Sequence, residues 1–262
     1  MIRILMIGDI FGRPGREAVI GSLPALRKSE ELDLVIANGE NVSSGRGMLP
    51  EHYELLREAG VDLFTSGNHI FGQKATRTLL DNKNEWLLRP ANYPASVSGR
   101  GDAIAETARG QRVAVINLMG RVFMKEDLDD PFRAAEDWLE DPKVRAAEAR
   151  VIDFHAEATS EKVCLAYFLD GKVSAVLGTH THVVTADTRV LPEGTGFQSD
   201  VGFVGPLHSS LGVRVENVIE SFLTQLPFKH EVASGPVTWN STIIEIENGL
   251  TVGIKPLAKH FE

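Results

Sequence analysis

Cysteine is nearly absent from this sequence, which has Cys164 as its only thiol among 262 residues. A single cysteine excludes an internal disulfide and is typical of a protein from a reducing compartment. Cys164 lies in the apolar stretch VCLAYFL. We therefore expect its thiol to be buried and inert rather than a nucleophile.

Long apolar runs are missing as well. The N-terminal segment MIRILMIGDI is interrupted after a few residues by Gly8 and Asp9, and it has no small-residue cleavage site of the kind that ends a signal peptide. No stretch approaches the ~20 apolar residues that are needed to cross a bilayer. We expect a cytoplasmic protein that does not use a membrane as a partner.

The chain also has few basic residues, with 27 Lys and Arg against 36 Asp and Glu and a net charge of −9. This balance does not favour a long nucleic acid as a partner, whereas bound cations would offset part of the deficit. No repeat, low-complexity tract or Pro/Gly/Ser-rich linker divides the chain, and 43% of its residues are hydrophobic. We predict one domain over residues 1–262, with two small domains as the alternative.

Three apolar segments, at residues 2–7, 33–37 and 61–65, predict short buried strands. Each is followed by a glycine and by oxygen ligands suited to a metal: Asp9 after the first, Glu40 and Asn41 after the second, and Asn68 after the third. In open α/β sheets, sites form at the carboxyl ends of the strands. Taken singly, Asp9 could be a helix cap and Glu40 a turn residue.

In the second half of the chain, histidines rather than oxygen ligands follow the predicted strands. The strand predicted at 150–154 ends in His155, and the buried segment 173–177 is followed by Gly178, His180 and His182. In an extended chain, side chains at i and i+2 point the same way, so this pair would aim two nitrogen ligands at one place. The alternative is a pair of surface histidines.

The remaining patterns predict an α/β fold. Helices are indicated over 14–28, 50–59, 74–82, 129–139 and 162–169, and another strand over 113–118. The glycine-rich residues 194–205 are expected to form a loop near the site. Apolar and polar residues alternate over 238–246 and over 250–254, on either side of an Asn-Gly turn, and this pattern predicts a hairpin. A doubly wound sheet and a sandwich of two sheets both agree with this order of elements.

The strand-end ligands are too many for one tetrahedral zinc and suffice for two ions that share a bridging carboxylate. Because imidazole, carboxylate and amide groups are mixed without a thiolate, the set favours iron or manganese, with zinc as the weaker option. A structural metal site is disfavoured because such sites are usually closed by four ligands. The candidate ligands are Asp9, Glu40, Asn41, Asn68, His155, His180 and His182.

The order of these blocks resembles the calcineurin-like metallophosphoesterase superfamily, and essentially the whole chain is similar to its YmdB-like branch of cyclic-nucleotide phosphodiesterases. Most of the superfamily has a metal-binding histidine where this chain has Phe11, and an aspartate where it has Glu40. Both departures are features of the YmdB-like branch, with Asn41 as the replacement ligand. The similarity rests on GDIFGRPGR at the start, NGEN at 38–41, SGNHI at 66–70, RPANYP at 89–94, FHAEATSEK at 154–162 and GTHTHV at 178–183.

The resemblance implies a four-layered α/β/β/α sandwich made of two mixed sheets. It also implies the distribution of the ligands over two metal ions that share Glu40. One ion would take Asp9, Glu40, Asn41 and His182, and the other would take Glu40, Asn68, His155 and His180. Through the family, a homo-oligomer is expected. For residues 120–150 the sequence leaves two positions open, at an interface or over the site.

The function that the resemblance implies is the hydrolysis of nucleoside 2′,3′-cyclic phosphates by a metal-bridging hydroxide. His69 would be the general acid that protonates the leaving alkoxide, or else a residue that only orients a ligand. Two other functions stay open: a phosphomonoesterase such as a nucleotidase, and a regulatory or RNA-associated protein that uses the metal site for binding. The substrate-binding residues are unassigned. Arg13, Arg46 and Arg121 are candidates for phosphate, with solvated arginines as the alternative. Tyr93 and Phe197 are candidates for stacking on a base, with packing in the core or at the rim of the site as the alternative.

Overall fold

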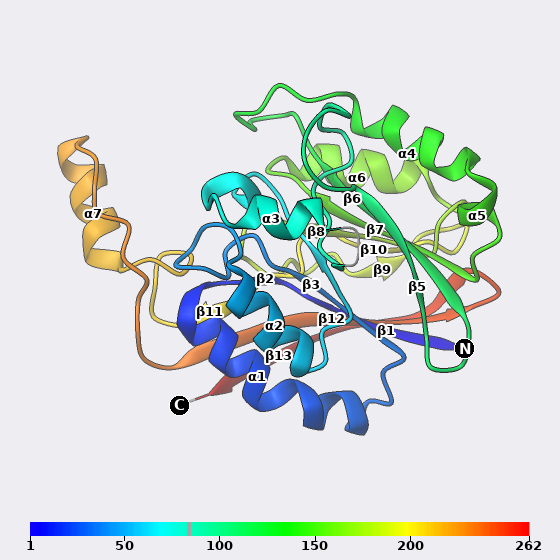
Figure 1. The fold of residues 1–262 in the computed structure, drawn as a ribbon, viewed down its shortest axis with the longest axis horizontal. Coiled ribbons are helices and arrows are strands. Elements are labelled where there is room, and N and C mark those ends of the chain that lie inside the picture. The colour runs from blue at the N-terminus through cyan, green and yellow to red at the C-terminus, as the bar shows by residue number, and fades with distance from the viewer. Residues whose placement is uncertain (83–84, 262) are drawn as a thin grey trace.

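Two β-sheets pack face to face between outer helices in a computed structural model, which describes residues 1–82 and 85–261 (Figure 1). The first sheet has seven strands, in the order β2-β11-β12-β1-β3-β4 with β13 paired to β12. The second sheet has six strands, in the order β5-β6-β7-β8-β10-β9. Each sheet contains both parallel and antiparallel pairs, so both are mixed.

The strands of the first sheet are β1 (Ile2–Ile7), β2 (Asp9–Ile10), β3 (Leu34–Asn38), β4 (Leu63–Thr65), β11 (Phe203–Pro206), β12 (Val237–Glu247) and β13 (Leu250–Phe261). Those of the second are β5 (Asp102–Glu106), β6 (Arg112–Met119), β7 (Ala149–His155), β8 (Ala175–Thr179), β9 (Arg189–Val190) and β10 (Gly196–Gln198). The helices are α1 (Gly12–Ser29), α2 (Pro50–Glu58), the 3₁₀ turn η1 (Ile70–Gly72), α3 (Thr76–Asp81), α4 (Pro131–Glu140), α5 (Pro142–Arg145), α6 (Thr159–Phe168) and α7 (Val215–Thr224).

The packing of strand β1 on both faces explains why its sequence is almost continuously apolar. Successive side chains of a strand point to opposite faces of the sheet. Leu5 and Ile7 lie in the cluster on the helix side, whereas Ile4 and Met6 lie in the cluster between the sheets, and none of the four is exposed. The buried strand predicted at residues 2–7 is confirmed. Its neighbour β3 is parallel, but β12 on the other side runs antiparallel.

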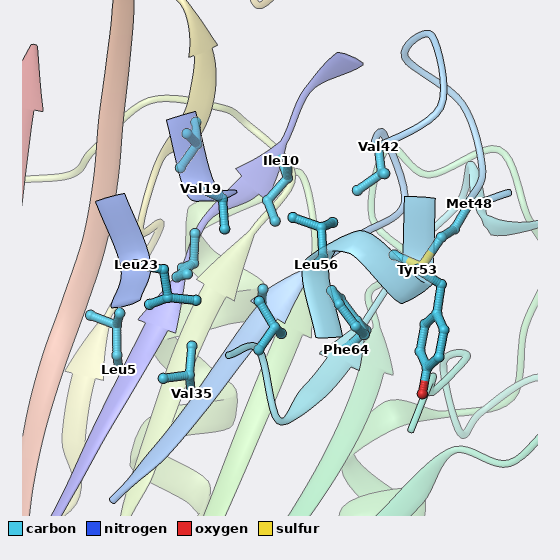
Figure 2. Close-up of a cluster of buried hydrophobic side chains, with 14 of the residues drawn as sticks. Leu5, Ile10, Val19, Leu23, Val35, Val42, Met48, Tyr53, Leu56 and Phe64 are labelled. Carbon is cyan, nitrogen blue, oxygen red and sulfur yellow. The ribbon is translucent and has the colours of Figure 1, made fainter. Parts of the chain in front are cut away.

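Three layers of buried apolar side chains separate the four layers of secondary structure. Figure 2 shows the first, in which Leu23 of α1 and Leu56 of α2 lie over the first sheet. The second layer, between the sheets, includes Met6 and Leu177. The third contains Trp138 of α4 and covers the outer face of the second sheet. The predicted α/β/β/α sandwich of two mixed sheets is therefore confirmed.

Several elements differ from the predictions. Residues 194–205 are not simply a loop, because β10 and most of β11 lie there and join this segment to both sheets. Helix α7 was not expected; it projects from the body of the molecule (Figure 1), and none of its residues is buried. The predicted hairpin is confirmed, although β13 continues to Phe261.

The prediction of a buried Cys164 is wrong, because this residue is exposed on α6. The apolar run around it forms a helix, and at helical spacing Leu165 and Ala166 face the core while Cys164 faces outward. Within the ranges 1–82 and 85–261, no helix is long and apolar enough to span a membrane. The single domain over 1–262 stays a prediction, and residue 262 lies outside the described ranges.

Candidate metal centre

The predicted ligands converge at the carboxyl ends of strands from both sheets. Each of them places a nitrogen or oxygen atom within 3.4 Å of an atom of another member of the set. The first sheet contributes residues from β2 and from the segments after β3 and β4, and the second sheet contributes β7 and the segment after β8. In chain order they are Asp9, Glu40, Asn41, Asn68, His155, His180 and His182.

One half of the cluster is centred on Nε2 of His155, which is fully buried. This atom lies 3.0 Å from Oδ1 of Asn68, 3.1 Å from Nδ1 of His180 and 3.3 Å from Oε1 of Glu40. Ligand atoms of Glu40, His155 and His180 all lie within 4.8 Å of one another, as a shared metal ion requires.

The other nitrogen of His155 is held from behind. The Thr179 hydroxyl donates to Oδ1 of Asp153 over 2.8 Å, so its oxygen is free to accept from Nδ1–H of His155, 2.9 Å away. This arrangement leaves a lone pair on Nε2, facing the oxygens of Asn68 and Glu40. Acceptor atoms packed this closely repel one another unless a proton or a cation lies among them. The donor set therefore fits a metal ion.

The electrostatics of the metal-free cluster agree with this interpretation. Burial by itself would lower the pKa of His155, but the carboxylates of Glu40, Asp9 and Asp153, with Glu40 the strongest, together outweigh it and raise the pKa to about 9. A proton on His155 thus supplies, without metal, part of the positive charge that the cluster needs. Burial, with the charge of His155, lowers the pKa of His180 to about 3. Its Nε2 lies 3.1 Å from Oε2 of Glu157, so Nδ1 is the atom turned to the cluster.

The second half of the cluster contains Asp9, Asn41 and His182. Nε2 of His182 lies 3.2 Å from Nδ2 of Asn41 and 3.6 Å from Oδ1 of Asp9. Nδ1–H of His182 donates to the carbonyl of Leu211 over 3.0 Å, which again leaves Nε2 as the free ligand atom. Phe11, at the position of the missing histidine, packs edge-on against the His182 ring at a centroid distance of 5.7 Å.

The amide of Asn41 has a different orientation from the one that metal binding requires. Its oxygen lies 2.8 Å from Nδ1 of His69, and its nitrogen faces Asp9, Glu40 and His182. Rotation of the amide by half a turn would present the oxygen to a metal and let the NH₂ group donate to Nδ1 of His69. Nε2 of His69 would then carry the ring proton in the neutral form.

His69 lies at the edge of the cluster with its side chain 34% exposed. Its backbone N–H donates to Oε2 of Glu40 over 2.8 Å, so the residue is tied to the carboxylate shared by both halves. Burial lowers the pKa of His69, and the charge of Arg46 acts in the same direction. Arg46 is therefore the arginine candidate whose charge acts on His69.

The other candidates for substrate contacts divide by their surroundings. Arg13 is 79% exposed and paired with Glu17 on α1, and Arg121 is paired with Asp130. Phe197 is completely buried, so the idea that it stacks on a base is wrong. The half-buried Tyr93 packs edge-on against Phe71, at a centroid distance of 5.4 Å.

The extended geometry predicted for the two histidines after Gly178 is wrong. Strand β8 ends at Thr179, and His180 and His182 have φ of +105° and +61°. These values are uncommon for residues with a side chain. Both rings still reach the cluster, but they do so through a tight irregular segment rather than through the alternation of a strand.

Sequence reasoning missed the buried polar residues behind the ligands. Asp153 lies one strand alternation before His155, and burial raises its pKa to about 7. Asn38 is the last residue of β3, and its amide nitrogen lies 3.4 Å from Nδ1 of His155. A polar residue inside an otherwise apolar strand, two positions before a candidate ligand, is the signal that could have identified both Asn38 and Asp153.

Gly67 provides a test of the geometry around His155. A Cβ at this position would lie 2.1 Å from Cδ2 of His155, so the ring must shift in Gly67→Ala. We expect the affinity for Co²⁺ to fall by about 10- to 100-fold, as for other losses of ligand orientation. The control is Gly21→Ala on α1, where nothing lies within 4 Å. An unchanged Co²⁺ affinity in Gly67→Ala would contradict the placement of His155.

Comparisons with known proteins agree with this geometry. The sequence model of a family described as YmdB-like protein matches residues 5–257. The 2′,3′-cyclic-nucleotide 2′-phosphodiesterase of Bacillus subtilis (strain 168) is 42% identical over 254 residues, which cover 97% of this chain and 95% of that protein.

Solved structures show the same likeness. A hypothetical protein from Thermus thermophilus has a TM-score of 0.93 and 45% identity, with 99% of both chains covered. A phosphatase from Mycoplasma pneumoniae has a TM-score of 0.91 and 32% identity, with 99% of this chain and 93% of that chain covered. The chain therefore belongs to the YmdB-like family of metallophosphoesterases and is an enzyme of the phosphoesterase class.

Proposed function

We propose that this chain is a dinuclear-metal phosphodiesterase that hydrolyses nucleoside 2′,3′-cyclic phosphates. The observation that carries the proposal is the position of Glu40 between the two halves of the cluster. Its Oε1 lies 3.3 Å from Nε2 of His155 on one side and 3.2 Å from Nδ2 of Asn41 on the other. A carboxylate placed in this way suits two ions. The substrate class is supported by the activity for which the Bacillus subtilis relative is named.

The ligands divide into two sets that share Glu40. One set is Asp9, Glu40, Asn41 and His182, and the other is Glu40, Asn68, His155 and His180. Two ions bound there would lower the pKa of water and supply positive charge against the phosphoryl oxygens. The mixture of imidazole and oxygen ligands favours iron or manganese over zinc.

His69 is proposed as the general acid. Its Nδ1 is engaged by Asn41 and its backbone by Glu40, so the ring is oriented and Nε2 is the nitrogen available to the substrate. A ribose alkoxide is a poor leaving group and needs a proton as the ester bond breaks. In its protonated form His69 would deliver that proton from Nε2 and become neutral, and it would take a new proton from water after each turnover.

The experiment compares 2′,3′-cyclic AMP with 3′,5′-cyclic AMP, a nitrophenyl diester and AMP as substrates, with Mn²⁺, Fe²⁺ or Zn²⁺ added. We expect the native protein to hydrolyse the 2′,3′-cyclic substrate and Asp9→Ala to lose this activity, because Asp9 is fully buried within the ligand set. Hydrolysis of AMP alone would show a phosphomonoesterase instead. No turnover of any substrate with any of the metals would favour a site that only binds.

A further inference from the structure

A buried ion pair that the proposed chemistry does not use lies next to the metal-binding histidines. Nζ of Lys162, on α6, is 3.0 Å from Oδ2 of Asp200, and both side chains are only 1% exposed. Removing two charges from water costs free energy that their mutual attraction does not always recover. A buried pair is therefore weak evidence for a role in stability, and its hydrogen bonds indicate another role.

The two charged groups hold the peptide groups on either side of His180. The ammonium of Lys162 donates to the carbonyl of Thr179 over 2.9 Å, and Oδ2 of Asp200 accepts from the N–H of Thr181 over 2.9 Å. The peptide segment 179–181 is thus fixed from both directions by one ion pair. It carries one of the candidate ligands at its centre and is followed directly by the other, His182.

Asp200 reaches the opposite side of the cluster as well. Its Oδ1 accepts from the N–H of Gly202 over 2.8 Å, and the carbonyl of Gly202 accepts from the N–H of Asp9 over 3.1 Å. One carboxylate therefore connects the histidine segment with the strand that presents Asp9.

The backbone at the histidines needs such support. His180 and His182 have φ of +105° and +61°, conformations that persist only where the surroundings hold them. Gly178 shows how closely the parts fit together. A Cβ there would lie 1.8 Å from the carbonyl oxygen of Ser199 and 3.0 Å from Cδ of Lys162.

We infer that Lys162 and Asp200 are a positioning pair that keeps His180 and His182 in their metal-binding orientation. The inference rests on the proposed function, because it takes these histidines to be metal ligands. Neither residue of the pair is among the candidate ligands; both act through the backbone that carries them. The pair lies outside the apolar layers that hold the sheets together. Loss of one partner leaves the other charge buried and unpaired, so we expect each single variant to lower the melting temperature and also to weaken metal binding.

The test is a titration of the metal-free full chain with Co²⁺, followed by visible absorption, which reports the coordination geometry. The variants are Lys162→Met and Asp200→Asn, compared with the native protein. We expect each variant to bind Co²⁺ about 10- to 100-fold more weakly and with an altered absorption band. The matched control is Leu165→Ala on the same helix, equally buried but facing the apolar layer. It should lower the melting temperature and leave the Co²⁺ affinity and the band unchanged.

The inference is overturned if Lys162→Met and Asp200→Asn bind Co²⁺ with the native affinity and spectrum and differ only in melting temperature, as Leu165→Ala does. If Lys162→Met does not fold, the test uses Asp200→Asn, because asparagine has the same shape as the native side chain. Its Co²⁺ affinity and its absorption spectrum then decide between the two outcomes. A native protein that fails to bind Co²⁺ would instead contradict the proposed function. The two failures are therefore distinguishable.

Discussion

Replacement of Glu40 by glutamine is expected to lower kcat for 2′,3′-cyclic AMP by on the order of 10³-fold, about 4 kcal/mol of transition-state stabilisation. Glu40 is 1% exposed, and it is the carboxylate nearest to both halves of the cluster. Glutamine keeps its shape but loses the negative charge and one acceptor oxygen. Both ions would be held less tightly, so we also expect a lower metal content after purification and a weaker Co²⁺ affinity.

The control for this change is Glu245→Gln. Glu245 pairs with Arg3 in the register of β1 with β12, whereas Asp9 follows the opposite end of β1. This variant removes the same charge far from the site and should keep native turnover. Native kcat in Glu40→Gln, measured at saturating Mn²⁺, would exclude a bridging role for this carboxylate.

Replacement of His69 by alanine is expected to have an effect that depends on the leaving group. With 2′,3′-cyclic AMP the leaving alkoxide needs a proton, and kcat should fall by about 10²- to 10⁴-fold. With a nitrophenyl diester the leaving group is stable as an anion, and kcat should change little. Steady-state kinetics with both substrates at saturating Mn²⁺ measures the difference.

A residue that only orients a ligand would behave otherwise. In that case His69→Ala would weaken Co²⁺ binding and slow both substrates by the same factor. His69 contacts the candidate ligands Asn41 and Glu40. An orienting role is therefore the alternative that the comparison of the two substrates must exclude. His260→Ala, an exposed histidine on β13, serves as the control for loss of an imidazole elsewhere.

The fold and the positions of the candidate ligands were predictable from the sequence because they depend on local patterns. An apolar run such as residues 2–7 forms a buried strand wherever both of its faces are covered, and a glycine with a polar residue after such a run marks its carboxyl end. The same logic placed Glu40, Asn68 and His155 at strand ends, and the structure brings them together. The α/β class followed from periodicity, but the choice of a two-sheet sandwich needed the family resemblance.

The remaining features were decided by contacts between distant parts of the chain. The conformation of His180 depends on Asp9, which is 171 residues away and accepts its N–H, and on the Lys162–Asp200 pair. No pattern of spacing within residues 178–182 contains this information.

Exposure was decided in the same way. Whether Phe197 packs inside the third apolar layer and Cys164 faces outward depends on which face of each element meets the sheet. A sequence segment specifies which faces it can bury. The partner that covers each face, and the backbone conformation that the partner imposes, exist only once the sheets and helices have packed together.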